Sequence, residues 1–141
     1  MVPRRILLMA VIATFFILIP QASMAQGKIA VEVDHTGQDI VGSRLAYQVK
    51  EGIRRSGGLR LTSIDEPRLI IYLVTMDEFN DTPGTATIFS YALVSKGTEG
   101  PRYFITSGVE KCGTQRVNES AEGLVADIDK EADDMRRFFS K

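Results

Sequence analysis

The two residue types that could form a thiol nucleophile and its base, cysteine and histidine, each occur once in this sequence. Cys112 is the only cysteine and His35 is the only histidine. A histidine in contact with a thiol can act as its base and generate a nucleophilic thiolate. One hypothesis is therefore a small thiol-dependent enzyme or redox sensor that uses Cys112. Catalysis is the less favoured alternative, because the segment Glu110-Lys111-Cys112-Gly113 matches no catalytic signature.

Both residues also have an ordinary structural interpretation. A free cysteine commonly packs as a small apolar side chain, and a single cysteine forms no disulfide within the chain. His35 lies where a predicted strand meets a predicted helix, which is a polar turn position near solvent. A usual zinc site needs further histidine or cysteine ligands, which the sequence lacks. We expect no cofactor and no metal site, and we keep Cys112 and His35 as catalytic candidates.

Oxygen-bearing side chains gather in the loop that contains Asp77, Glu78, Asn80 and Asp81. Their oxygens are suitable calcium ligands, but the spacing does not fit the twelve-residue calcium loop. A solvated hairpin with Asx-type turns fits this segment better.

A second acidic group lies on the last predicted helix. It comprises Asp127, Asp129, Glu131, Asp133 and Asp134. Such a surface either binds a basic partner or is the solvated side of a helix. Asp127 and Asp133 are therefore candidate partner-binding residues.

The first 25 residues have the pattern of a secretory signal peptide. Arg4 and Arg5 precede an apolar run of 14 residues, Ile6 to Ile19, and Ser23 and Ala25 are small residues before a cleavage point. The run is shorter than the roughly 20 residues that cross a bilayer as a helix, and no cysteine follows it for lipid attachment. We expect cleavage between Ala25 and Gln26 and a periplasmic or secreted protein without a stable membrane anchor.

The mature chain, residues 26–141, is long enough for a single domain with an ordinary apolar core. It carries 15 basic and 18 acidic residues, a net charge near −3. This balance disfavours nucleic-acid binding, which usually shows a basic surplus or stripe.

The first half of the mature chain alternates between strand and helix patterns. Alternating apolar residues predict a strand at Lys28–Asp34. A helix should follow, with Thr36 as its cap and Asp39 in its first turn, and it should end near Arg55 before two glycines. Its apolar face is the fourfold-spaced set Val41, Leu45, Val49 and Ile53.

Four strands and a helix complete the chain. The strands are expected at Leu59–Ile64, Leu69–Met76, Thr85–Ser95 and Arg102–Val109, and the helix is expected from Asn118, its predicted cap, onward. Short polar turns between the last three strands favour an antiparallel meander. We therefore expect an α+β two-layer sandwich, in which two helices pack on one face of a mostly antiparallel sheet of about five strands.

The far face of that sheet poses a question about partners. Leu69–Met76 is apolar on both sides, because Ile70, Tyr72 and Val74 alternate with other apolar residues. Either a loop or sheet curvature covers this far face, or part of it is a partner site that includes Tyr72.

The order of elements resembles that of small bacterial envelope domains, such as the amino-terminal domain of TolB or the periplasmic part of the CsgG family. The resemblance covers most of the mature chain, and it carries over no site residue. The favoured hypothesis is an exported, non-catalytic binding or cell-envelope assembly domain, whose partner is another envelope protein or a second copy. The alternatives are the thiol-dependent enzyme and an exported inhibitor of another enzyme, which would use the loops Asp77–Gly84 and Lys96–Pro101.

Overall fold

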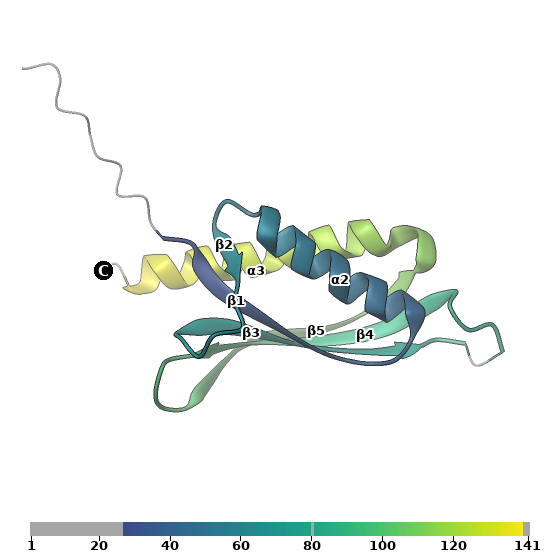
Figure 1. Ribbon diagram of the computed structural model, residues 1–141, viewed down its shortest axis with the longest axis horizontal. Helices are drawn as coiled ribbons and strands as arrows, with labels where there is room; N and C mark the ends of the chain where they lie inside the picture. Colours follow the sequence, from purple (N-terminus) through teal and green to yellow (C-terminus); the bar gives the residue numbers. More distant parts are fainter. Residues whose placement is uncertain (1–26, 80, 140–141) are drawn as a thin grey trace, which may run out of the picture.

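Five strands form one mixed sheet, and two helices lie against one of its faces (Figure 1). The computed structural model describes residues 27–79 and 81–139. The predicted leader, its cleavage site after Ala25, and Asn80 lie outside the described residues. Within them, the predicted α+β class, the order of elements and the two helices on one face are confirmed.

The elements follow one another as predicted, with shifted ends. They are β1 (Ile29–Thr36), α2 (Ile40–Arg55), β2 (Leu59–Leu61), β3 (Arg68–Asp77), β4 (Ala86–Lys96), β5 (Arg102–Gly113), a 3₁₀ turn (Thr114–Arg116) and α3 (Val117–Phe139). The strand β2 is shorter than predicted, whereas β5 continues four residues beyond the predicted end at Val109.

The strand order is β2-β1-β3-β4-β5. Parallel ladders join β1 to β2 and β1 to β3, and longer antiparallel ladders join β3 to β4 and β4 to β5. The predicted meander of β3, β4 and β5 is therefore confirmed. The two edges differ greatly in length, because β2 has 3 residues and β5 has 12.

The core lies between the sheet and the helices. The four fourfold-spaced residues of α2 are at most 1% exposed, as the apolar spacing predicts. They pack with Ile71, Leu73, Phe89 and Leu93 of the sheet and with Leu124 and Ile128 of α3. Because burial of each large aliphatic side chain stabilises a fold by about 1.5–3 kcal/mol, this layer fixes the helices on the sheet.

Both predicted helix caps are wrong. Thr36 is still part of β1, where it pairs with Val74, and the N-cap of α2 is Asp39, whose carboxylate accepts the amide hydrogen of Gly42 at 2.6 Å. Asn118 lies inside the first turn of α3, which continues directly from the 3₁₀ turn. At α2, strand pairing sets the boundary rather than the local preference of a polar residue for a cap.

Candidate functional site

His35 belongs to a hydrogen-bonded network at the end of β1. Its Nε2 atom lies 3.0 Å from Thr75 Oγ1, and the Thr75 hydroxyl donates to Asp39 Oδ1 at 2.7 Å. Because the one hydroxyl proton of Thr75 is directed to Asp39, the imidazole is the donor in its bond to Thr75. The network ties β1 and β3 to the capping residue of α2.

The charge states in this network follow from burial and hydrogen bonding. Burial lowers the pKa of His35 below its ordinary 6.5, despite the opposing effect of the Asp39 carboxylate, so the imidazole is neutral at pH 7. Burial raises the pKa of Asp39, but hydrogen bonds, from the Thr75 hydroxyl first, outweigh this effect and leave the pKa lowered. Asp39 is therefore a carboxylate that is held by its donors.

This geometry supports a structural role for the network. Thr75 is 5% exposed, and its proton is already held by Asp39. The backbone fills the surrounding space, since a Cβ atom at Gly37 or Gly42 would lie 2.1 or 2.2 Å from Thr75 Oγ1. No room is left for a substrate at this hydroxyl. Sequence reasoning found His35 but missed Thr75, whose only signal was a hydroxyl within an apolar strand.

Cys112 lies in the core and away from His35. It is 1% exposed, and its Sγ lies 3.5 Å from the carbonyl oxygen of Gly113. His35 is in β1, whereas Cys112 is in β5, three strands away across the sheet. Neighbouring strands are about 4.8 Å apart, so about 14 Å separates the two strands. The structure does not bring the two catalytic candidates together.

The loop after β3 has the turn bonds expected from its sequence. The Asp77 carboxylate accepts hydrogen bonds from the amides of Phe79 and Gly84, at 3.5 and 2.9 Å. Across residues 27–79 and 81–139, no three histidine, cysteine or acidic side chains are arranged to hold a metal ion. In the same ranges, no helix is long and apolar enough to cross a membrane.

The sheet face turned away from the helices carries exposed apolar side chains. We call Val74, Met76, Ile88, Phe104 and Val109 the open face; their exposed fractions run from 36% to 72%. The strand register places them on one side, because Met76 pairs with Ile88 and Ser90 pairs with both Val74 and Val109. Neither helix covers this side (Figure 1).

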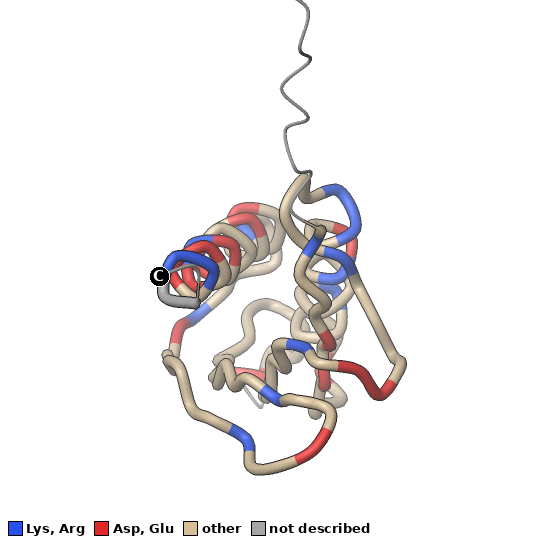
Figure 2. The backbone as a smooth tube through the Cα atoms, turned by 90° about the vertical axis from the view of Figure 1, so that its left-hand side faces the viewer, with Lys and Arg blue, Asp and Glu red and all other residues tan. Residues whose placement is uncertain are grey.

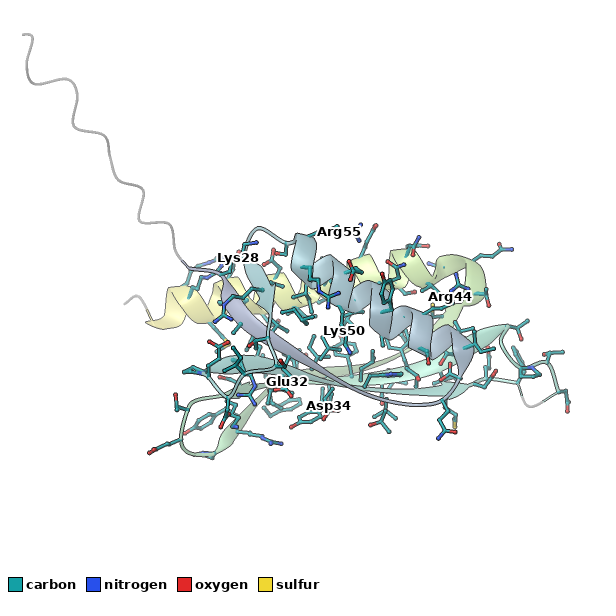
Figure 3. The ribbon with its side chains drawn as sticks, viewed as in Figure 1. Lys28, Glu32, Asp34, Arg44, Lys50 and Arg55 are labelled. Carbon is teal, nitrogen blue, oxygen red and sulfur yellow. The ribbon has the colours of Figure 1, made fainter. Side chains whose placement is uncertain are left out.

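The β1 end of the same side is covered. Ile70 is 2% exposed, although it lies on the same side of β3 as the exposed Val74. The segment 62–67 leads from β2 past β1 to β3, and its Asp65 pairs with Arg68 at 2.8 Å and with Lys96 at 2.7 Å. Arg68 also pairs with Glu32 at 2.5 Å. Figure 3 shows Glu32 and Asp34 on the side of the sheet away from α2. Polar groups thus cover one end and leave the open face exposed.

Two cations lie beside the open face. The guanidinium of Arg102 lies 5.7 Å from the ring centre of Tyr72 and donates to its hydroxyl. The ammonium of Lys111 lies 5.5 Å from the ring centre of Phe79 and pairs with Glu78. Tyr72, a sequence-predicted partner-binding residue, therefore lies next to the open face and is already bonded to Arg102.

The other two predicted partner-binding residues point to different sides of α3. Asp133 pairs with Arg136 at 2.5 Å, and Arg136 reaches the carbonyl oxygen of Gly58 before β2. Asp127 instead lines a groove against Glu110 of β5. Acidic positions recur along α3 (Figure 2), but the five carboxylates do not form one surface.

Comparisons with known proteins give no family for this chain. No family model and no curated protein matches it. A solved structure of the hypothetical protein CT253 from Chlamydia trachomatis is 7% identical, with a TM-score of 0.46, over 75% of this chain and 98% of that chain. A minor lipoprotein from Acinetobacter baumannii is 8% identical, with a TM-score of 0.41, over 72% of this chain and 92% of that chain. Neither similarity bears on the function of this chain.

Proposed function

We propose that the chain is an exported, non-catalytic binding domain of the cell envelope, and that its sheet provides the binding surface. The observation that carries this proposal is the open face, five large apolar side chains that are 36% to 72% exposed on one side of a sheet. Contiguous apolar patches are uncommon on isolated soluble proteins and usually mark interaction sites. The signal-like leader supports export.

The thiol-dependent alternative has less support. A reactive cysteine needs access to its substrate and a group that stabilises the thiolate. Cys112 is 1% exposed, and His35 is three strands away from it.

Site-specific photocrosslinking in the native envelope tests the proposed function. A photoreactive residue at Val109 samples the open face, and the same residue at Tyr47, 59% exposed on α2, is the matched control. We expect discrete crosslinked products from position 109 that position 47 does not give. Identical products at both positions, or none at position 109, would contradict a binding surface on the sheet.

A further inference from the structure

The outer edge of β5 presents unpaired backbone groups. The amide of Thr114 donates to the carbonyl oxygen of Thr85 at 3.0 Å, which fixes the phase of the β4–β5 ladder. In an antiparallel ladder, alternate residues bond to the same neighbour, so Ser107, Val109 and Lys111 direct their N–H and C=O groups away from β4. Within the described residues, no backbone hydrogen bond to these outward groups is present. An edge of this kind is a template for another strand.

The two sides of this edge differ in chemistry. On the open-face side, Val109 is 72% exposed. On the helix side, a groove of about 220 Å³ between β5 and α3 is lined by Glu110, Glu119 and Asp127 and by one basic residue, Arg116, among others. A strand added at this edge would therefore meet the exposed Val109 on one side and a predominantly acidic groove on the other.

The acidic side has charges that this chain does not pair. Glu119 pairs with Arg116 at 2.8 Å, and Glu131 lies 3.6 Å from Lys130. Among the described residues, neither Glu110 nor Asp127 forms an ion pair.

These carboxylates also act on a common neighbour, Tyr91 of β4. Burial is the main cause of its raised pKa, and the charges of Asp127, Glu110 and Glu131 add to the effect. The ring of Tyr91 lies beneath Gly108, where an added Cβ would come within 2.7 Å of it. The three carboxylates therefore act on one place behind the edge strand.

We propose that the β5 edge binds an extended segment of a partner protein as an additional strand, with basic side chains facing Glu110 and Asp127 and apolar side chains beside Val109. This inference rests on the proposed function as a binding domain. Backbone bonds to Ser107, Val109 and Lys111 would supply affinity, and the alternation of basic and apolar residues would supply specificity. Opposite charges directly across two strands stabilise their pairing, whereas like charges destabilise it.

The same charges disfavour a second copy of this chain as the occupant. On the helix side, an added β5 strand would present Thr106, Gly108, Glu110 and Cys112. It would bring no basic side chain to the acidic groove and would add another glutamate. A partner segment with alternating lysine or arginine would face Glu110 and Asp127, the two groove carboxylates that form no ion pair among the described residues.

Peptide titration of the mature chain, residues 26–141, tests this inference. The probe is a nine-residue capped peptide that alternates lysine with valine or threonine, and the reference peptide has glutamate in place of lysine. Amide NMR should show saturable shifts at Ser107, Val109 and Lys111 with the lysine peptide only. Because each charge pair contributes modestly, Glu110→Gln with Asp127→Asn should weaken binding about 3- to 30-fold. The matched pair Glu99→Gln with Glu122→Gln should leave it unchanged.

A second variant tests the backbone bonds themselves. Val109→Pro removes an outward N–H, and proline is tolerated in edge strands at such positions, so the variant should fold and lose peptide binding. If the Val109→Pro variant does not fold, the weakened peptide binding of the variant with Glu110→Gln and Asp127→Asn still tests the inference.

Four results would overturn the inference. The first is the absence of saturable shifts, and the second is equal binding of both peptides. The third is a set of shifts that is confined to the open face and unchanged by Val109→Pro. The fourth is a concentration-dependent shift at the edge without peptide, which would indicate that a second copy binds there. Crosslinking at Val109 in the envelope together with any of the first three would refute the edge but keep the proposed function.

Discussion

Replacement of Thr75 by valine should remove the centre of the His35–Thr75–Asp39 network while keeping the shape of the side chain. The variant loses a hydroxyl that donates to Asp39 at 2.7 Å and accepts from His35 at 3.0 Å. A hydrogen bond to a charged group contributes about 1.5–3 kcal/mol, so the free energy of unfolding should fall by about 2 kcal/mol at pH 7. With a urea m-value of about 2 kcal/mol/M, the midpoint should fall by about 1 M.

The pH dependence gives this prediction its sharper test. The pKa of Asp39 is lowered in the folded state from 3.8, so its stabilising contribution is complete above 3.8 and is lost as the pH falls through the lowered value. Thr75→Val removes the main bond that lowers this pKa. The stability difference between wild type and variant should therefore be largest near pH 7 and should shrink as the pH falls below 3.8.

Urea denaturation followed by circular dichroism, from pH 7 down to pH 3, measures this difference. Thr75→Ser is the control, because it keeps the hydroxyl and loses one buried methyl group, worth about 0.8 kcal/mol; its pH dependence should follow the wild type. A Thr75→Val loss below about 0.5 kcal/mol, or one that is constant over the pH range, would show that the network does not hold Asp39 as described.

Two further predictions concern Cys112 and Asp65. Cys112 is 1% exposed, so a thiol reagent reaches it only when the core opens. The reagent should therefore label the native chain about a hundredfold or more slowly than the urea-unfolded chain, as measured by absorbance. Rapid labelling of the native chain would support the thiol-based alternative. Hydrogen bonds from Lys96 first and then Arg68 lower the pKa of Asp65 to about 2, so Lys96→Gln should raise that pKa toward 3.8 more than Arg68→Gln does. Carboxyl NMR titration would show the opposite order if Arg68 were the main partner.

The sequence predicted the helices and the order of elements along the chain, because apolar periodicity identifies each helix and strand; the order of strands within the sheet was not predicted. The fourfold spacing of Val41, Leu45, Val49 and Ile53 places these residues on one face of a helix, and the structure buries that face. The cap of α2 was a different problem, because both Thr36 and Asp39 can cap a helix. Pairing of Thr36 with Val74 keeps it in the strand, and that contact joins residues far apart in the chain.

The length of β5 shows the same limit. The residues Glu110 to Gly113 have little intrinsic preference for a strand, yet they pair with Ala86–Phe89 of β4. The bond from Thr75 to Asp39 joins residues 36 positions apart, so it follows from the β1–β3 ladder and not from any local pattern. Sequence patterns therefore located the elements, whereas tertiary pairing determined their ends and the His35 network.

The apolar strand β3 explains why the far face could not be predicted. Ile70 and Met76 lie on the same side and are both apolar, but they are 2% and 63% exposed. At the Ile70 end of this side, Asp65 of the segment 62–67 forms ion pairs with Arg68 and Lys96, and the path of this segment depends on the strand order β2-β1-β3. Because this segment covers only the β1 end, the exposed apolar side chains lie over β3, β4 and β5 and reach the unpaired edge. A strand bound at that edge would extend the sheet and the open face together, so one partner could engage both surfaces.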